Sequence, residues 1–203
     1  RGLSTNNTSR GCVANGIEHV AKEGIFTRGI LLDATLLGYL NEGTNPWLAP
    51  GTAVKRADIE RLEGLEGVTI RKGDVILLYT GRWARRAAKG AWPSQCTGGN
   101  APPNCGEAGY WYDNIPLFYE RSIAQFGADA WNDTTPATGL SDYAGLPFHG
   151  FQAVLGIAHY DNLDLEALAA TTKRLRKWEF LFTTAPFPVV GGITSPLNPI
   201  AMF

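Results

Sequence analysis

The pattern of hydrophobic and polar positions predicts buried strands interspersed with amphipathic helices. Two apolar runs, 29–33 and 75–80, are short and bounded by turn-forming residues, which is typical of buried strands. Ile59, Leu62 and Leu65 recur at helical spacing with charged residues between them, so they predict an amphipathic helix over 57–65. Both element types therefore contribute to the expected core.

Shorter patterns predict the remaining elements. Gly24 follows a possible helix and would end it. The further helices are expected over 17–22, 115–126 and 165–171, and the further strands over 68–70, 126–130, 178–183 and 187–190. The apolar tail that ends at Phe203 is expected to be packed, and 81–113 is expected to be a long irregular segment. The mixture indicates an α/β or mixed α+β fold without the regular βαβ alternation of a doubly wound sheet.

Length and composition favour one globular domain over 1–203. The chain has 203 residues, of which 44% are hydrophobic and 18% charged, and it shows no repeat or linker. Lys and Arg number 18 against 19 for Asp and Glu, giving a net charge of −1, so we expect neither nucleic-acid binding nor a polybasic membrane anchor. No apolar stretch approaches the ~18 residues of a membrane span. The compartment is left open, with the cytoplasm favoured over secretion.

Two of the three cysteines, Cys96 and Cys105, bracket a loop rich in Gly and Pro. A local disulfide would suit an oxidising compartment, and two unpaired buried thiols are the alternative. A zinc site would require two more ligands nearby, and the sequence shows none.

Histidine and carboxylate positions suggest one candidate site. His149 precedes an apolar helix, and Asp161 follows twelve positions later, so the two could act as a base with a metal ligand or with an orienting partner. A lone histidine beside an apolar run is more often structural, and His19 and His159 are interpreted as surface or packing residues.

Arg82 and Trp83 follow the strongest predicted strand and a glycine. Arg82 could clamp a carboxylate or carbonyl, and Trp83 could stack on an aromatic ring. A glycine turn with a solvated arginine and a packing tryptophan is the alternative. No phosphate loop, nucleophile elbow or HExxH motif occurs, so spacing alone specifies no reaction.

Four ordered segments resemble blocks of the metal-dependent cyclase-like hydrolases, the family of kynurenine formamidase and isatin hydrolase. These segments are 26–33, 72–83, 161–166 and 191–201. The resemblance implies a swivelling β/β/α fold that assembles as a homodimer or homotetramer. It also implies hydrolysis of a small cyclic amide, N-acyl amide or lactone by a water that a divalent metal, zinc or manganese, activates.

The resemblance also assigns residues. His149 matches a downstream histidine that is a proton shuttle or additional metal ligand, and Asp161 matches a position where the smaller formamidases have a metal-binding glutamate. Arg82, Trp83 and Phe148 become candidates for the substrate pocket.

The family's main ligand motif, His-x-Gly-Thr-His-x-Asp, has no counterpart in 1–25. We expect a ligand-bearing segment ahead of Arg1. The alternative is a non-catalytic relative that binds a small molecule or serves as an assembly subunit.

Overall fold

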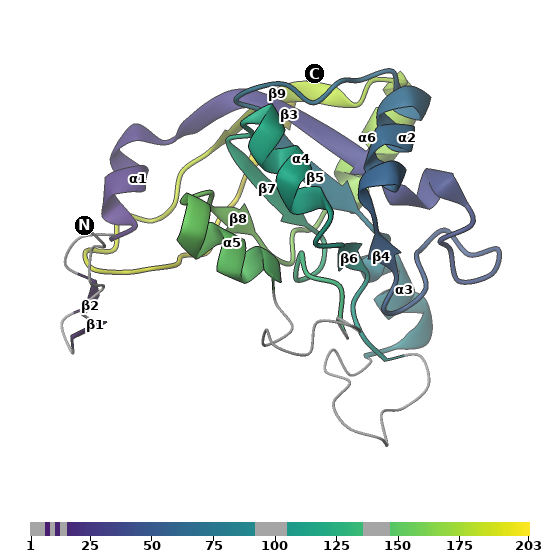
Figure 1. Cartoon of the computed structure of the whole chain (residues 1–203), viewed down its shortest axis with the longest axis horizontal. Helices are drawn as coiled ribbons and strands as arrows, with labels where there is room; N and C mark the ends of the chain where they lie inside the picture. Colours follow the sequence, from purple (N-terminus) through teal and green to yellow (C-terminus); the bar gives the residue numbers. More distant parts are fainter. Residues whose placement is uncertain (1–6, 9–10, 13–15, 92–104, 136–146) are drawn as a thin grey trace. The chain divides into compact units, whose positions relative to one another are not determined.

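The computed structural model describes residues 7–8, 11–12, 16–91, 105–135 and 147–203 (Figure 1). The chain divides into two compact units, one formed by Gly29–Glu179 and the other by Arg1–Arg28 with Phe180–Phe203. The single domain expected from the sequence stays a prediction, and the two units are taken in turn.

A parallel sheet organises the larger unit. Its strands lie in the order β3, β5, β7 and β8, and Gly29–Asp33 of β3 pair in register with Val75–Tyr79 of β5. The bounds of the four strands are β3 Ile25–Asp33, β5 Val75–Tyr79, β7 Gln125–Ala128 and β8 His159–Tyr160. A smaller parallel pair joins β4 (Ala53–Val54) to β6 (Gly109–Tyr110).

Helices lie in the connections between these strands. They are η1 Ala34–Leu37, α2 Arg56–Glu66, α3 Arg82–Lys89, α4 Asn114–Arg121 and α5 Pro147–Leu155, with α6 Glu166–Leu175 after β8. The mixed α/β prediction is confirmed. The crossovers do not follow the regular alternation of a doubly wound sheet, because β4 and β6 of the smaller pair lie within two of them.

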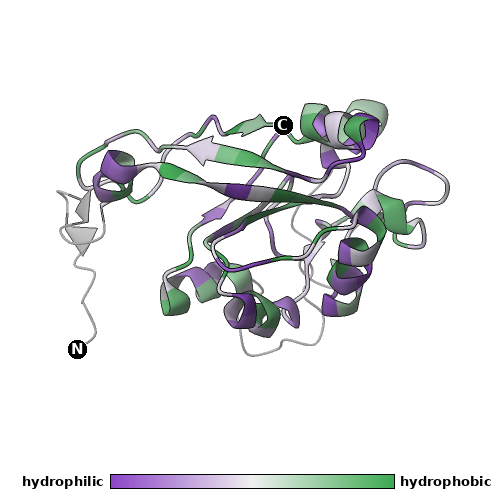
Figure 2. Ribbon diagram, turned by 90° about the horizontal axis from the view of Figure 1, so that it is seen from above, coloured by the Kyte–Doolittle hydropathy of each residue, from purple (hydrophilic) through white to green (hydrophobic). Residues whose placement is uncertain are grey.

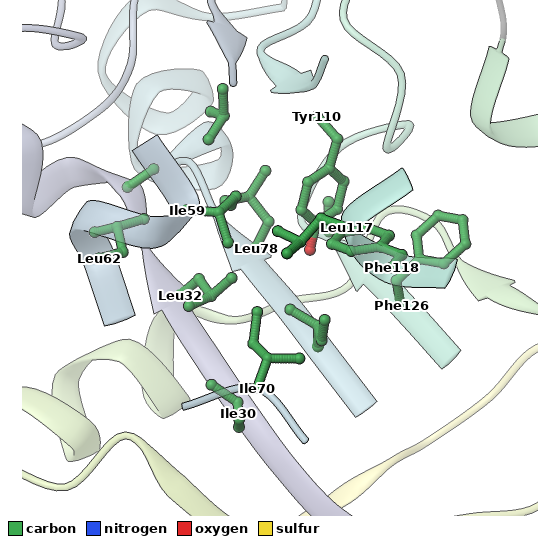
Figure 3. Close-up of a cluster of buried hydrophobic side chains, with 14 of the residues drawn as sticks. Ile30, Leu32, Ile59, Leu62, Ile70, Leu78, Tyr110, Leu117, Phe118 and Phe126 are labelled. Atoms are coloured by element: carbon green, nitrogen blue, oxygen red, sulfur yellow. The ribbon is translucent and has the colours of Figure 1, made fainter. Parts of the chain in front are cut away.

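The main core lies on one face of this sheet. Alternate strand residues point to the same face, so Ile30 and Leu32 of β3 join Leu78 of β5 there. They meet apolar side chains of α2, α4 and α5, and Figure 3 shows those of α2 and α4 directed toward the strands. Leu31 and Leu77, which alternate with these residues, are also buried. Strands buried on both faces explain the continuous apolar runs (Figure 2).

Helix α2 confirms the predicted amphipathic helix, with one change in its buried face. Ile59 and Leu62 are fully buried, whereas Leu65 is 56% exposed. Glu66 is buried in its place. The helix ends at Gly67, whose φ of 66° lies in the left-handed region that glycine adopts most easily.

Two predicted strands are wrong, because local hydrogen bonds replace strand pairing. In 68–70, the N–H groups of Val68 and Ile70 donate to the carbonyl and carboxylate oxygens of Glu63. In 187–190, the N–H of Val189 donates to the carbonyl of Phe187, forming a tight turn.

Two further boundaries differ from the prediction. The expected helix over 115–126 ends at Arg121, because Ser122 adopts a left-handed conformation with φ of 50°. Strand β7 then begins at Gln125. The segment 81–113, expected to be irregular, begins with α3.

The smaller unit contains α1 (Glu18–Glu23), which ends at Gly24 as predicted. Strand β9 (Glu179–Thr184) pairs antiparallel with β10 (Ile200–Met202), and β1 (Asn7–Thr8) pairs with β2 (Gly11–Cys12). The Phe203 ring lies 5.6 Å from that of Phe180 but stays 44% exposed.

The sequence also led to predictions about a disulfide and about membrane-spanning segments. Cys105 is disulfide-bonded, whereas Cys96 lies outside the described residues. Within the described segments, no helix combines the length and apolar character needed to span a membrane.

A buried carboxyl group, that of Asp33, lies at the end of β3. Asp33 has no exposed surface, and its Oδ2 lies 2.8 Å from Nζ of Lys173. Its backbone N–H donates to Oε1 of Glu66 at 2.7 Å. Burial raises the pKa of Glu66 to about 9, so this carboxyl is neutral near pH 7.

We expect Glu66→Gln to reduce the pH dependence of folding. The pKa of Glu66 is higher in the folded than in the unfolded chain, so its contribution to stability is full below pH ~4.5 and is lost as pH rises through ~9. Between pH 6 and 9 the wild type should lose roughly 1–3 kcal/mol more than the variant, measured by denaturant unfolding. The exposed Glu60→Gln on the same helix is the control, and parallel profiles for Glu66→Gln and wild type would refute the assignment.

Candidate metal site

The candidate site lies at the carboxyl ends of β5, β7 and β8. Parallel strands bring these ends to one edge of a sheet, where α/β proteins commonly bind ligands. Polar residues follow each strand end. They are Arg82 and Trp83 after β5, Asn132 and Asp133 after β7, and Asp161 and Asn162 after β8. His149 comes from α5, which lies between β7 and β8 in the chain (Figure 1).

Three side chains converge at this edge. One ligand atom from each of His149, His159 and Asp161 lies within 4.8 Å of the other two. Oδ2 of Asp161 is 3.3 Å from Nε2 of His149 and 3.2 Å from Nε2 of His159. The two imidazole rings are 4.5 Å apart between centroids. The structure thus unites His149 and Asp161, which the sequence singled out, with a third donor.

Asp133 orients His149. Its Oδ2 lies 2.6 Å from Nδ1 of the imidazole, and its Oδ1 accepts the backbone N–H of Phe148 at 2.7 Å. Asp133 itself has no exposed surface. The hydrogen bond to Asp133, reinforced by Asp161, raises the pKa of His149 to about 9. Without a metal, His149 is therefore a cation between two carboxylates near neutral pH.

Asn132 orients Asp161. Its side-chain amide donates to Oδ1 of Asp161 at 2.6 Å and to the carbonyl of Tyr160 at 2.9 Å. Oδ2 is thereby left facing the two histidines. Burial alone would raise the pKa of Asp161, but hydrogen bonds to His149 and His159 hold that pKa below its ordinary value. The carboxylate therefore stays ionised, as a metal ligand must be.

His159 was interpreted from the sequence as a surface or packing residue, and the structure gives it a polar partner as well. Its side chain is only 8% exposed and stacks on Phe126 at 5.5 Å between ring centroids. Its Nε2 faces Asp161. A spacing of two residues in an extended chain places both side chains on one face, and this signal could have identified His159.

The donor set fits a divalent cation. Two imidazole nitrogens and one carboxylate oxygen are ligands that Zn²⁺ binds in catalytic sites, where an open position remains for water. Ligands held tetrahedrally at about 2.1 Å from one ion are ~3.4 Å apart, close to the separations from Asp161. The Asp133–His149 contact is the orienting hydrogen bond that metal-binding histidines usually make.

The three residues predicted to line a substrate pocket make contacts with other parts of the protein. Arg82 contacts Glu107 and Asn162, and the indole N–H of Trp83 donates to the carbonyl of Leu163 at 2.8 Å. Phe148 is fully buried in the aromatic core. Its ring lies 5.4 Å from both Tyr110 and Phe126. Their roles in substrate binding stay predictions.

Three residues were not predicted from the sequence. Asn132 and Asp133 fix the orientation of the cluster, and Asp129 is buried between the strand ends. These residues could have been found from the sequence, because two carboxylates and an amide follow a buried strand.

Comparisons with known proteins place the chain among cyclases. The family model named "Cyclase" matches residues 5–133, a stretch that contains Arg82, Trp83 and Asp133 but ends before the three candidate ligands. No curated protein matches the sequence.

Solved structures match over a longer range. A structure described as a novel cyclase is 26% identical, with a TM-score of 0.70 over 93% of this chain and 57% of its own. Isatin hydrolase A from Ralstonia solanacearum is 18% identical, with a TM-score of 0.66 over 98% of this chain and 67% of its own. A potential metal-dependent hydrolase with cyclase activity is 15% identical, with a TM-score of 0.52 over 88% and 64%. The chain thus spans 57–67% of the length of these three proteins.

We expect His149 to make the stability of the metal-free protein depend on pH. Because its pKa is higher in the folded chain, its stabilising effect is complete below pH ~6.5 and disappears as pH rises through about 9. In the presence of a chelator, His149→Gln should therefore be less stable than wild type at pH 6 and equally stable near pH 10. Thermal unfolding measures the difference, with the exposed His19→Gln as the control. A constant difference across this range would disprove the coupling to Asp133 and Asp161.

Proposed function

The chain belongs to the cyclase family, and from that premise we propose that it is a metal-dependent hydrolase. The observation that carries the proposal is the convergence of His149, His159 and Asp161 at the carboxyl edge of the parallel sheet. The enzyme would hydrolyse the C–N bond of a cyclic amide or N-acyl amide, or the ester bond of a lactone.

Three atoms would hold the cation: Nε2 of His149, Nε2 of His159 and Oδ2 of Asp161. A divalent ion, Zn²⁺ or Mn²⁺, would supply a water of lowered pKa and polarise the scissile carbonyl. The histidines favour borderline metals of this kind over Mg²⁺ or Ca²⁺, which select oxygen ligands.

The surrounding residues prepare the three donors. Asp133 accepts the Nδ1 proton of His149 and so directs the Nε2 lone pair toward Asp161. Loss of the Nε2 proton is required before this nitrogen can bind a metal. Asn132 occupies Oδ1 of Asp161 and leaves Oδ2 for the ion. The cluster carries two carboxylates, those of Asp133 and Asp161, which together balance a divalent charge.

The substrate class is supported by the structural relatives. Isatin hydrolase A, by its name, acts on isatin, a planar cyclic amide, and its fold matches 98% of this chain. Isatin is therefore the first substrate to test, followed by an N-formylated arylamine and an aromatic lactone.

Removal of the metal or of Asp161 should abolish hydrolysis. We expect purified protein loaded with Zn²⁺ or Mn²⁺ to lose activity on chelation and recover it when the ion is restored. Asp161→Asn should lower both metal content and turnover, the latter by about 10²-fold or more. Elemental analysis and spectrophotometric hydrolysis assays give the two values. Asp164→Asn is the control, because Asp164 lies in the same segment but contacts the backbone N–H of Glu166.

His149→Ala separates the two roles open to this histidine. A variant without metal identifies His149 as a ligand, and a variant that keeps the metal but loses turnover identifies it as a proton shuttle. The hydrolase proposal fails if the loaded wild type holds no metal or hydrolyses none of the three substrates.

A further inference from the structure

The first two residues of α3 reach the segment that carries Asp161. The indole N–H of Trp83 donates to the carbonyl of Leu163 at 2.8 Å, and Nη1 of Arg82 donates to Oδ1 of Asn162. Both acceptors lie within two residues of Asp161. Two neighbouring side chains of one helix thus hold the segment 161–163.

The start of α3 is itself firmly fixed. Asp129 has no exposed surface, and its Oδ2 accepts the N–H groups of Gly81 and Arg82 at 2.9 and 3.1 Å. Its Oδ1 accepts the hydroxyl of Thr80 at 2.7 Å. A carboxylate at this position also interacts favourably with the positive end of the helix dipole. The helix start is therefore tied to the end of β7.

Arg82 is held from both sides. Its Nε lies 3.0 Å from Oε2 of Glu107, and its Nη2 donates to Oε1 of Glu107 at 3.1 Å. Glu107 is only 2% exposed. If Arg82 turned toward a substrate carboxylate, Glu107 would remain as a buried charge without this partner, which is strongly unfavourable.

The segment 161–163 is also attached to β7 through its backbone. The N–H of Asn162 donates to the carbonyl of Ala130 at 2.9 Å, and that of Leu163 donates to the carbonyl of Ala128 at 3.1 Å. Asn162 adopts a left-handed conformation with φ of 56°. The chain thus turns sharply just after Asp161, and α3 and β7 together define where that turn lies.

We propose that Arg82 and Trp83 are positioning residues that set the place of the Asp161 carboxylate in the metal cluster. This inference rests on the proposed function. It replaces the substrate-contact role that the sequence suggested for the two residues, because their polar groups are directed to the protein. Removal of residues that orient a metal ligand typically lowers the metal affinity by about 10–100-fold.

Two conservative substitutions test the inference with Co²⁺ alone as the probe. Trp83→Phe keeps an aromatic ring and removes the donor to Leu163. Arg82→Lys keeps the charge but cannot bridge Glu107 and Asn162 at once. We expect each variant to bind Co²⁺ about 10–100-fold more weakly than wild type in calorimetric titrations. The visible absorption bands of the bound Co²⁺ should also shift, because the ligand geometry changes.

Lys89→Ala, at the exposed end of the same helix, should bind Co²⁺ like wild type. Wild-type affinity and spectra in both Trp83→Phe and Arg82→Lys would overturn the positioning role. With a hydrolysed substrate in hand, a raised KM at unchanged Co²⁺ affinity would likewise overturn it and restore a substrate contact. If wild type itself binds no Co²⁺, the proposed metal site fails first, so the two failures are distinguishable.

Discussion

The buried carboxylate of Asp129 is the constraint on which the candidate site depends. It accepts hydrogen bonds from Thr80, Gly81 and Arg82, and so joins the end of β7 to the first turn of α3. Burial raises the pKa of Asp129 to about 7, although the hydrogen bonds from Thr80 and Arg82 act to lower that pKa. Because α3 is fixed there, Arg82 and Trp83 can hold the segment after β8.

At this sheet edge, the residues that hold the scaffold differ in burial from the candidate metal ligands. Asp129 and Glu107 lie in the protein interior and hold the scaffold, whereas Asp161 is exposed and His149 partly so. Asp133 and Asn132 each form a hydrogen bond with one atom of a candidate ligand, His149 and Asp161 respectively. The second polar atom of each ligand is left facing the cluster. Fixing ligands in this way reduces the reorganisation needed when a cation binds, and it sets the metal geometry that hydrolysis would require.

Sequence patterns predicted the parts of the fold that depend on continuous burial. The runs at β3 and β5 and the periodicity of α2 were sufficient because each element packs through its own apolar residues. Helix α3 was missed because its polar sequence gains its position from Asp129, a residue 47 positions beyond Arg82. For the site, His149 and Asp161 were singled out from their positions in the sequence, and the family resemblance assigned their roles. His159 was missed because it was interpreted as a surface or packing residue, although its spacing of two residues from Asp161 places both side chains on one face of an extended chain.

Anomalous X-ray diffraction from crystals grown with Zn²⁺ or Mn²⁺ is the sharpest test of the metal site. We expect one strong peak at about 2.0–2.2 Å from Nε2 of His149, Nε2 of His159 and Oδ2 of Asp161. We also expect Asp133 to keep its hydrogen bond with Nδ1 of His149. A crystal in which these atoms hold no ion, while Nε2 of His149 remains hydrogen-bonded to Asp161, would contradict the proposed metal site.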